Sequence, residues 1–403
     1  MDDIPLSLPL LLDGATGTQL QERGMPPGGC VEEWVLAHPE ALLDIQRRYV
    51  DAGAQVLLAP TFGASPAALA RFGLAHRAEE YNMALAALSS QAAGGRVMVA
   101  GDLAPCALEL APAGTAAFEE LVDNYKVQVG ALRRAGVELY VAETMITLAE
   151  ARAAALAVAE GDPGKPLLVS FYCNSEGRAP DNTDVLAALI TLQGMGAAAF
   201  GLNCVSPEIL VEQLERLAPY ATVPLLAMPG FTQSAGDDAL ARWAGRYAAL
   251  GVRCFGGCCG TTPEQIATLK AALGRLDFSS LPVREQDEDL IFCASGQEAR
   301  FLTPDVDVGK AIECSPSLLE DILRIEDEPH GALKIAILDE DDLDLFAAHQ
   351  YAVQDALCIW SDVPELLEKA LRLYQGRAFW DHTADLEPEF LSEMRRKYGL
   401  VLL

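Results

Sequence analysis

Short apolar runs alternate with longer amphipathic stretches along the chain as far as Leu276. The runs are short and nearly continuously apolar, as expected of buried parallel strands. These runs are Leu10–Ala15, Gln55–Phe62, Val97–Leu103, Val137–Thr144, Pro166–Cys173, Ala197–Cys204, Val223–Pro229 and Val252–Cys259. The stretches between them repeat apolar residues at helical spacing, which predicts helices. The predicted helices are Pro39–Ala52, Pro66–Ala93, Ala116–Ala135, Ile146–Glu160, Thr183–Gly196, Pro207–Leu217, Asp237–Leu250 and Pro263–Leu276.

Strands that alternate with helices in this number are typical of a closed (β/α)8 TIM barrel. An open, doubly wound sheet is the alternative, but no Gly-x-Gly-x-x-Gly motif follows the first apolar run. We therefore predict an α/β fold with a TIM barrel over residues 1–278. In such barrels the active site forms at the carboxyl ends of the strands.

The composition changes after the barrel. Residues 279–290 are predicted to be a solvated linker, and residues 291–403 an acidic, smaller α/β domain at the C-terminus. Its predicted strands are Ala332–Leu338, Ala356–Trp360, Ala378–Trp380 and Leu400–Leu403. Its predicted helices are Ser317–Ile325, Asp342–Tyr351, Pro364–Gln375 and Pro388–Tyr398.

Composition and charge narrow the classes of function. The chain has 403 residues, of which 51% are hydrophobic, and its formal net charge is −29. This charge argues against nucleic acid and anionic membrane surfaces as partners. No apolar run approaches the roughly 20 residues of a membrane span, and the acidic start of the chain does not resemble a signal peptide. We expect a cytoplasmic protein.

Two adjacent cysteines, Cys258 and Cys259, lie between glycines at the end of the eighth apolar run. Neighbouring cysteines form a strained disulfide, because their Cα atoms are too close together. Cys204 ends the sixth run, so three thiols are expected on one rim of the barrel. Zinc binds thiolates tetrahedrally and keeps one position open in catalytic sites. A buried apolar role is the alternative for Cys204 alone, but the adjacent pair favours a metal site.

A zinc site with three protein sulfurs leaves its fourth position for a sulfur substrate. The metal would convert a bound thiol to a thiolate nucleophile near neutral pH without a general base. Asp13 and Glu143 end the first and fourth runs, so their carboxylates are expected at the same mouth. They would hold a cationic group such as an amino-acid ammonium, although both could also be ordinary solvated loop carboxylates.

Five motifs together resemble the zinc-dependent homocysteine S-methyltransferases, and most closely the homocysteine-binding domain of cobalamin-dependent methionine synthase. The resemblance covers about residues 8–276 in the family's order. The motifs are Asp13-Gly14-Ala15-Thr16-Gly17-Thr18, Pro60-Thr61-Phe62-Gly63-Ala64, Glu143-Thr144, Gly201-Leu202-Asn203-Cys204 and Gly256-Gly257-Cys258-Cys259-Gly260-Thr261-Thr262-Pro263-Glu264. The resemblance implies a (β/α)8 barrel in which Cys204, Cys258 and Cys259 are the catalytic zinc ligands. It also implies that homocysteine binds the metal through its sulfur.

For the rest of the substrate, the resemblance implies that Asp13 and Glu143 hold the amino group of homocysteine. The backbone around Ala15 and Thr16 would meet the carboxylate. The sequence departs from the family's pattern at Asp102, which replaces the small residue common after the glycine of the third strand.

The C-terminal part faintly resembles a truncated form of the pterin-binding barrel that follows the homocysteine barrel in methionine synthases. Trp360 stands where that barrel has its pterin-contacting aspartate, which argues against folate binding. We interpret this part as a structural or partner-docking domain. The sequence contains no Asp-x-His-x-x-Gly motif for cobalamin, so any corrinoid must come on another chain.

The predicted function is methyl transfer to homocysteine, giving methionine. The expected donor is methylcobalamin carried by a separate corrinoid protein. The first alternative is a self-sufficient methyltransferase that uses S-methylmethionine, betaine or a similar small donor. The second alternative, from a different class, is a non-catalytic subunit that binds zinc or thiols.

Overall fold

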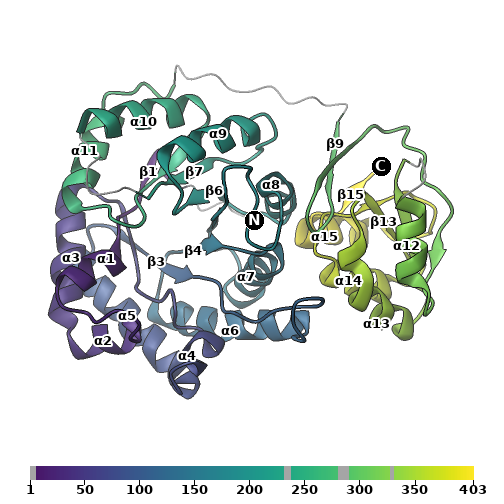
Figure 1. Cartoon of the computed structure of the whole chain (residues 1–403), viewed down its shortest axis with the longest axis horizontal. Coiled ribbons are helices and arrows are strands. Elements are labelled where there is room, and N and C mark those ends of the chain that lie inside the picture. The colour runs from purple at the N-terminus through teal and green to yellow at the C-terminus, as the bar shows by residue number, and fades with distance from the viewer. Residues whose placement is uncertain (1–5, 231–236, 280–289, 327–330) are drawn as a thin grey trace.

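The computed structural model describes residues 6–230, 237–279, 290–326 and 331–403. Two parallel sheets lie side by side, each covered by helices (Figure 1). We propose that they correspond to two domains, at residues 1–278 and 291–403. Most of the predicted linker, residues 280–289, lies outside the described residues.

The first sheet is a nearly closed barrel, which confirms the predicted fold. Its strands are β1 (Leu10–Leu11), β2 (Val56–Leu58), β3 (Met98–Leu103), β4 (Leu139–Met145), β5 (Leu167–Phe171), β6 (Ala199–Asn203), β7 (Leu225–Met228) and β8 (Val252–Phe255). They pair in parallel in sequence order, and β1 also pairs with β8. Between β1 and β2 a single parallel bridge joins Leu12 to Val56, and Gln55 N donates to Leu11 O at 2.7 Å.

Alternate residues of each barrel strand face inward, as the pleat of a strand requires. The interior is filled by an apolar cluster of residues such as Leu10, Val56, Val141 and Leu226. The opposite faces pack under the surrounding helices in a second, larger cluster. Since both faces are buried, each strand is a continuous apolar run, which is why the strands could be found in the sequence.

The helices around the barrel follow the predicted order with two differences. They are α1 (Thr16–Glu22), α2 (Val31–Ala37), α3 (Pro39–Ala52), α4 (Pro66–Ala70), α5 (Ala78–Ala93), α6 (Phe118–Ala135), α7 (Leu148–Gly161), α8 (Val185–Gly194), α9 (Pro207–Leu217), α10 (Asp237–Ala249) and α11 (Pro263–Leu273). The prediction of one helix over Pro66–Ala93 is wrong, because the chain turns at Gly73, whose φ is +74°. Helices α1 and α2 were not predicted. No helix in the described residues is long and apolar enough to span a bilayer.

The second sheet is open and contains five parallel strands in sequence order. Its strands are β11 (Ile312–Glu313), β12 (Leu333–Ala336), β13 (Leu357–Trp360), β14 (Phe379–Trp380) and β15 (Val401–Leu402). Its helices are α12 (Leu318–Glu326), α13 (Glu340–His349), α14 (Pro364–Leu373) and α15 (Pro388–Tyr398). A hairpin of β9 (Ile291–Ala294) and β10 (Ala299–Leu302), which the sequence did not predict, precedes the sheet. The resemblance to a truncated pterin-binding barrel stays a prediction.

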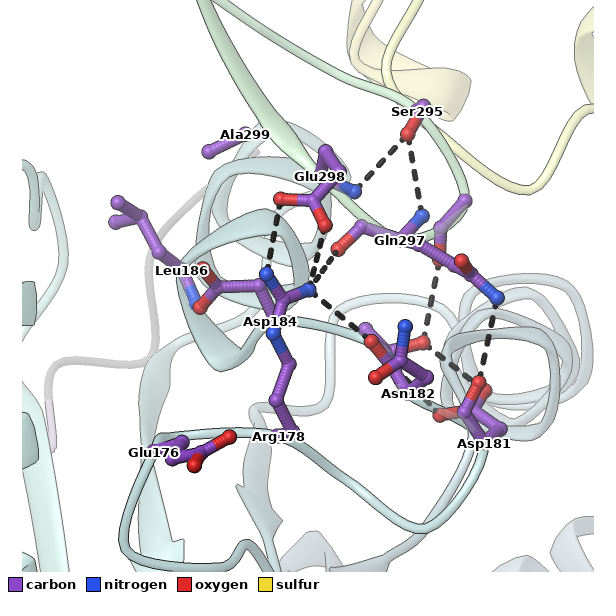
Figure 2. A network of polar contacts seen from close by, with 12 residues as sticks. Glu176, Arg178, Asp181, Asn182, Asp184, Leu186, Ser295, Gln297, Glu298 and Ala299 are labelled. Carbon is purple, nitrogen blue, oxygen red and sulfur yellow. Dashed lines mark hydrogen bonds and ion pairs between the residues drawn. The ribbon is translucent and has the colours of Figure 1, made fainter. Parts of the chain in front are cut away.

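The turn of this hairpin contacts the loop between β5 and α8 of the barrel through a polar network (Figure 2). Arg178 forms an ion pair with Glu298, with 2.7 Å between Nη1 and Oε1. Asp184 N donates to Gln297 O at 2.8 Å, and Gln297 Nε2 donates to Asp181 O at 3.3 Å. Backbone groups of both segments are therefore satisfied across the interface.

A second contact joins α7 to α14. Arg152 is fully buried, and its Nη2 and Nη1 donate to Leu371 O at 3.1 Å and Arg372 O at 3.3 Å. These carbonyls belong to the last turn of α14, where a cation is also favoured by the helix dipole. Arg372 in turn pairs with Glu119 and Glu160 of the barrel. The two sheets are thus joined by charged as well as apolar contacts.

Candidate active site and metal centre

A cavity of about 560 Å³ opens at the carboxyl ends of the barrel strands. Its size lies in the usual range for small-molecule sites. All seven site residues predicted from the sequence line this cavity. They are Asp13, Ala15, Thr16, Glu143, Cys204, Cys258 and Cys259. The structure therefore brings together side chains that lie far apart in the sequence.

The sulfur atoms of Cys204, Cys258 and Cys259 lie within 4.8 Å of one another. Cys204 and Cys258 are paired as a disulfide with their Cα atoms 5.4 Å apart, and the Cys259 sulfur lies 3.5 Å from that of Cys204. Tetrahedral zinc with bonds of about 2.3 Å needs sulfurs about 3.8 Å apart. Reduced, the three thiols fit such an ion, and no other group of this kind occurs in the described part of the chain.

The backbone at the strand ends places these thiols. Cys204 follows β6 with φ +57°, a left-handed conformation that is uncommon outside glycine. In the loop after β8, a Cβ atom on Gly257 would lie 2.3 Å from the Thr261 side chain, so the turn requires glycine. Cys258 N donates to Pro229 O at 2.9 Å, which fixes this loop against the end of β7.

The carboxylates of Asp13 and Glu143 lie at the same end of the barrel. Asp13 is 3% exposed, and its Oδ2 accepts a hydrogen bond from Leu58 N at 3.1 Å. Burial raises the pKa of Asp13 well above its ordinary value, although the bond from Leu58 opposes this shift. Burial also raises the pKa of Glu143 to about 7. Both groups are therefore poised for a cation that would compensate their burial.

Asn203 also contacts the site, although no role was predicted for it from its motif. It is fully buried, and its Nδ2 lies 3.1 Å from Glu143 Oε2, 2.6 Å from Thr144 Oγ1 and 3.7 Å from the Cys258 sulfur. Its Oδ1 accepts from Thr144 N at 2.9 Å. One amide thus connects the carboxylate side of the cavity to the thiol side. Its position directly before Cys204 was the available signal.

Glu32, which the sequence analysis missed, comes from the unpredicted helix α2 and also lines the cavity. Its Oε1 accepts from Gly63 N at 2.8 Å, and its Oε2 accepts from the Cys30 thiol at 3.3 Å. Burial raises the pKa of Cys30 to about 11, and the charge of Glu32 contributes to the shift. Glu32 therefore has partners of its own, and it holds the loop after β2 against α2.

The first turn of α1 also forms part of the cavity wall. Ala15 N donates to Thr261 O at 3.2 Å, and Ala15 O accepts from the Tyr49 hydroxyl at 3.1 Å. The backbone groups of Ala15 are thus engaged within the protein. Ala15 and Thr16 were predicted to meet the substrate carboxylate. Of these two, Thr16 is the residue whose amide lies in the first turn of a helix, where anions are favoured.

A sequence model described as homocysteine S-methyltransferase matches residues 10–273. The chain belongs to this family. The match ends with α11, so it covers the barrel and not the second sheet. It confirms the resemblance found in the motifs, and it identifies the chain as a methyltransferase of the homocysteine S-methyltransferase type.

Proteins named methionine synthase and homocysteine S-methyltransferase are similar to about two thirds of this chain. The chain is 28% identical over 304 residues to the methionine synthase of Mycobacterium leprae, covering 68% of this chain and 25% of the relative. It is 28% identical over 298 residues to the homocysteine S-methyltransferase of Escherichia coli, covering 65% of this chain and 94% of the relative. The chain therefore spans about a quarter of the methionine synthase it matches and nearly all of the shorter enzyme.

Solved structures support the same assignment. The oxidized form of the homocysteine methyltransferase MmuM from Escherichia coli is 27% identical, with a TM-score of 0.58, over 65% of this chain and 95% of that one. Its metallated form is also 27% identical, with a TM-score of 0.57 and the same coverage. The likeness covers about two thirds of this chain and nearly all of the Escherichia coli enzyme.

Proposed function

We propose that the chain methylates the sulfur of homocysteine at a zinc site held by Cys204, Cys258 and Cys259, giving methionine. The observation that carries this proposal is the meeting of three thiols with the carboxylates of Asp13 and Glu143 in one cavity of the barrel. Zinc, when bound there, lowers the pKa of a thiol that enters its open position, so that the thiol becomes a nucleophile near neutral pH.

The side chains of the cavity would orient the amino-acid end of homocysteine. Asp13 and Glu143 accept hydrogen bonds from its ammonium group, and their burial makes a charge-assisted bond strong. Thr16 presents its amide to the carboxylate. Asn203 holds the Glu143 carboxylate in place through the contact between Nδ2 and Oε2. Substrate orientation of this kind lowers the entropic part of the activation barrier.

The reaction itself is a displacement at carbon. The homocysteine sulfur, having lost its proton, forms a bond to the methyl carbon of the donor. The bond between that carbon and the donor breaks, and its electron pair leaves with the donor. The chain's residues contribute by holding the sulfur and the ammonium at fixed positions, while the mouth of the cavity admits the donor.

Methylcobalamin on a separate corrinoid protein is our first candidate for the donor, because methionine synthases are among the relatives. The mouth of the cavity supports delivery from outside, since Phe62 and Phe72 line it and are 43% and 42% exposed. A small cationic donor such as S-methylmethionine or betaine is the second candidate. It is favoured by the same aromatic faces, which attract sulfonium and ammonium groups, and by the acidic lining.

A metal assay combined with a donor screen tests the proposal. The purified, reduced chain should bind one zinc ion and produce methionine from homocysteine with at least one of methylcobalamin, S-methylmethionine and betaine. Turnover with a small cationic donor alone would remove the need for a corrinoid partner. A chain that binds no stoichiometric metal under reducing conditions would contradict the proposed site.

A further inference from the structure

Asp102 is a buried carboxylate of the cavity that the proposed reaction does not yet use. It lies on β3, two residues after Ala100, which packs in the barrel interior. Because alternate residues of a strand face the same side, the Asp102 side chain also points inward. It is 4% exposed and lines the cavity. Its strand partner is Val141, so Glu143 lies two residues nearer the mouth on the neighbouring strand.

The backbone of Asp102 is held firmly, whereas its carboxylate is not. Asp102 N donates to Thr61 Oγ1 at 3.1 Å, and Asp102 O accepts from Thr61 Oγ1 at 2.8 Å and from Gln128 Nε2 at 3.2 Å. Its buried Oδ1 has no hydrogen-bond partner among the described residues. Buried polar atoms are rarely left in this state, because the loss of their hydration is then not compensated by a hydrogen bond.

The charges that act on Asp102 are all negative. Burial raises its pKa well above the ordinary value, and the charges of Glu143, Asp13 and Glu32 raise it further. Glu32 is hydrogen-bonded to Gly63 N and Cys30, whereas Asp13 and Glu143 face the cavity. Three carboxylates from β3, from β4 and from the end of β1 therefore line one cavity. Arg71 lines the same cavity, but none of the three forms an ion pair with a cationic side chain of the described residues.

We propose that Asp102 is a third carboxylate that binds the ammonium group of homocysteine, together with Asp13 and Glu143. An ammonium group has three N–H donors and no acceptor, so three carboxyl groups can each accept one of its hydrogen bonds. This inference rests on the proposed function and deepens it, because it makes Asp102 a specificity-determining residue. A thiol without an ammonium group would leave the three carboxyl groups without a cation, so the site would bind it less well.

Calorimetric titration of the zinc-loaded, full-length chain tests this role without a methyl donor. The probes are homocysteine and 4-mercaptobutanoate, which is homocysteine without its amino group. In Asp102→Asn, we expect homocysteine to bind roughly 10- to 100-fold more weakly, the loss expected for a hydrogen bond to a charged group. Binding of 4-mercaptobutanoate should stay unchanged or tighten, because one repulsive charge is removed.

Asp162→Asn is the matched control, since Asp162 is a buried carboxylate that accepts from the Tyr140 hydroxyl at 2.9 Å, away from the cavity. Asp162→Asn should leave the binding of both probes unchanged.

The unfolding midpoint of the ligand-free protein gives a second measurement. Asp102→Asn should raise this midpoint, because it removes a like charge, so a variant that unfolds earlier or fails to fold would overturn the proposal.

Equal weakening of both probes in Asp102→Asn, or homocysteine binding within twofold of wild type, would also overturn the inference. So would a variant in which the KM of the methyl donor rises while homocysteine binding is intact, because Asp102 would then serve the donor. These outcomes leave the proposed function standing. If the zinc-loaded wild-type chain binds no homocysteine at all, the proposed function fails as well.

Discussion

The two sheets of this protein are built from the same unit, and the cavity that holds the three thiols lies in the barrel. Both run parallel strands in sequence order. The barrel closes through the bridge of Leu12 to Val56, so the ends of β1, β4 and β6 and the loop after β8 meet at one cavity. The open sheet spreads its strand ends along a line. Closure, rather than the strand–helix unit itself, brings the chemistry together.

The two sheets also differ in whether their charged side chains are paired with an opposite charge. In the open sheet Lys334 pairs with Asp381 at 2.6 Å, and Lys334 Nζ also lies 2.7 Å from Thr383 Oγ1. Its buried charge is therefore neutralised within the protein. In the barrel, Asp13 and Glu143 have no cationic side chain beside them among the described residues. The charge in the open sheet is thus compensated within the protein, whereas the carboxylates of the barrel are left to be compensated by protonation or by a ligand.

The strongest test of this contrast is to remove one thiol from the barrel. We expect Cys258→Ser to lose bound zinc and at least about a thousandfold in kcat/KM, which corresponds to about 4 kcal/mol of transition-state stabilisation. Cys314→Ala, in the open sheet, is the control and should retain metal and activity. Zinc analysis and steady-state kinetics measure both. Retention of metal and activity by Cys258→Ser would contradict the assignment.

The unpaired carboxylates should make the stability of the metal-free protein fall as the pH rises. Glu143 has a pKa of about 7 in the folded chain against an ordinary value of 4.5. Between these values the folded chain binds more protons than the unfolded chain, so the free energy of unfolding decreases with increasing pH. The full shift corresponds to about 3 kcal/mol. Urea unfolding at pH 5 and pH 7 should show a smaller decrease in Glu143→Gln, and an equal decrease would count against this pKa.

The contact between the sheets can be weakened selectively at Arg152. Arg152→Met leaves Leu371 O and Arg372 O without their donor, which should destabilise the open sheet by about 2 kcal/mol. Arg253→Met is the matched control, because Arg253 donates to two carbonyls within the barrel, Ala248 O and Val252 O. Hydrogen exchange should speed up in α14 for the first variant only. Faster exchange confined to the barrel would contradict this role of Arg152.

The smallest effect is expected at the hairpin contact. Arg178→Ala removes the ion pair with Glu298, whose side chains are 26% and 24% exposed. A loss of about 1 kcal/mol or less is typical of such pairs. Proteolysis between the two sheets should quicken slightly while kcat stays constant. Arg246→Ala breaks a more exposed pair with Glu215 and should have no effect on this proteolysis.

Much of the barrel could be predicted because its strands are buried on both faces and therefore form continuous apolar runs. The short elements could not be predicted from the sequence. Helices α1 and α2 contain seven residues each, too few to show a helical period, and the break at Gly73 depends on one left-handed residue. The hairpin of β9 and β10 was missed because its strands are short, only partly buried and packed mainly against α8.

In the candidate site, too, some features could be predicted from the sequence and others could not. The thiols could be predicted because cysteines at the ends of two strands must share a rim in a closed barrel. The contacts of Asn203 and Glu32 could not, because each joins segments whose separation in space is set by the tertiary fold. Asp102 was visible only as a departure from the family's pattern, since nothing in its own strand reveals the missing partner of Oδ1.

X-ray absorption spectroscopy of the zinc-loaded protein is the most direct test of the central claim. Without substrate, the spectrum should fit three sulfur ligands and one lighter atom. After homocysteine is added, it should fit four sulfurs at about 2.3 Å. A spectrum that contains fewer than three sulfurs, or that does not change when homocysteine binds, would contradict the claim that three cysteines hold a metal whose open position receives the substrate thiol.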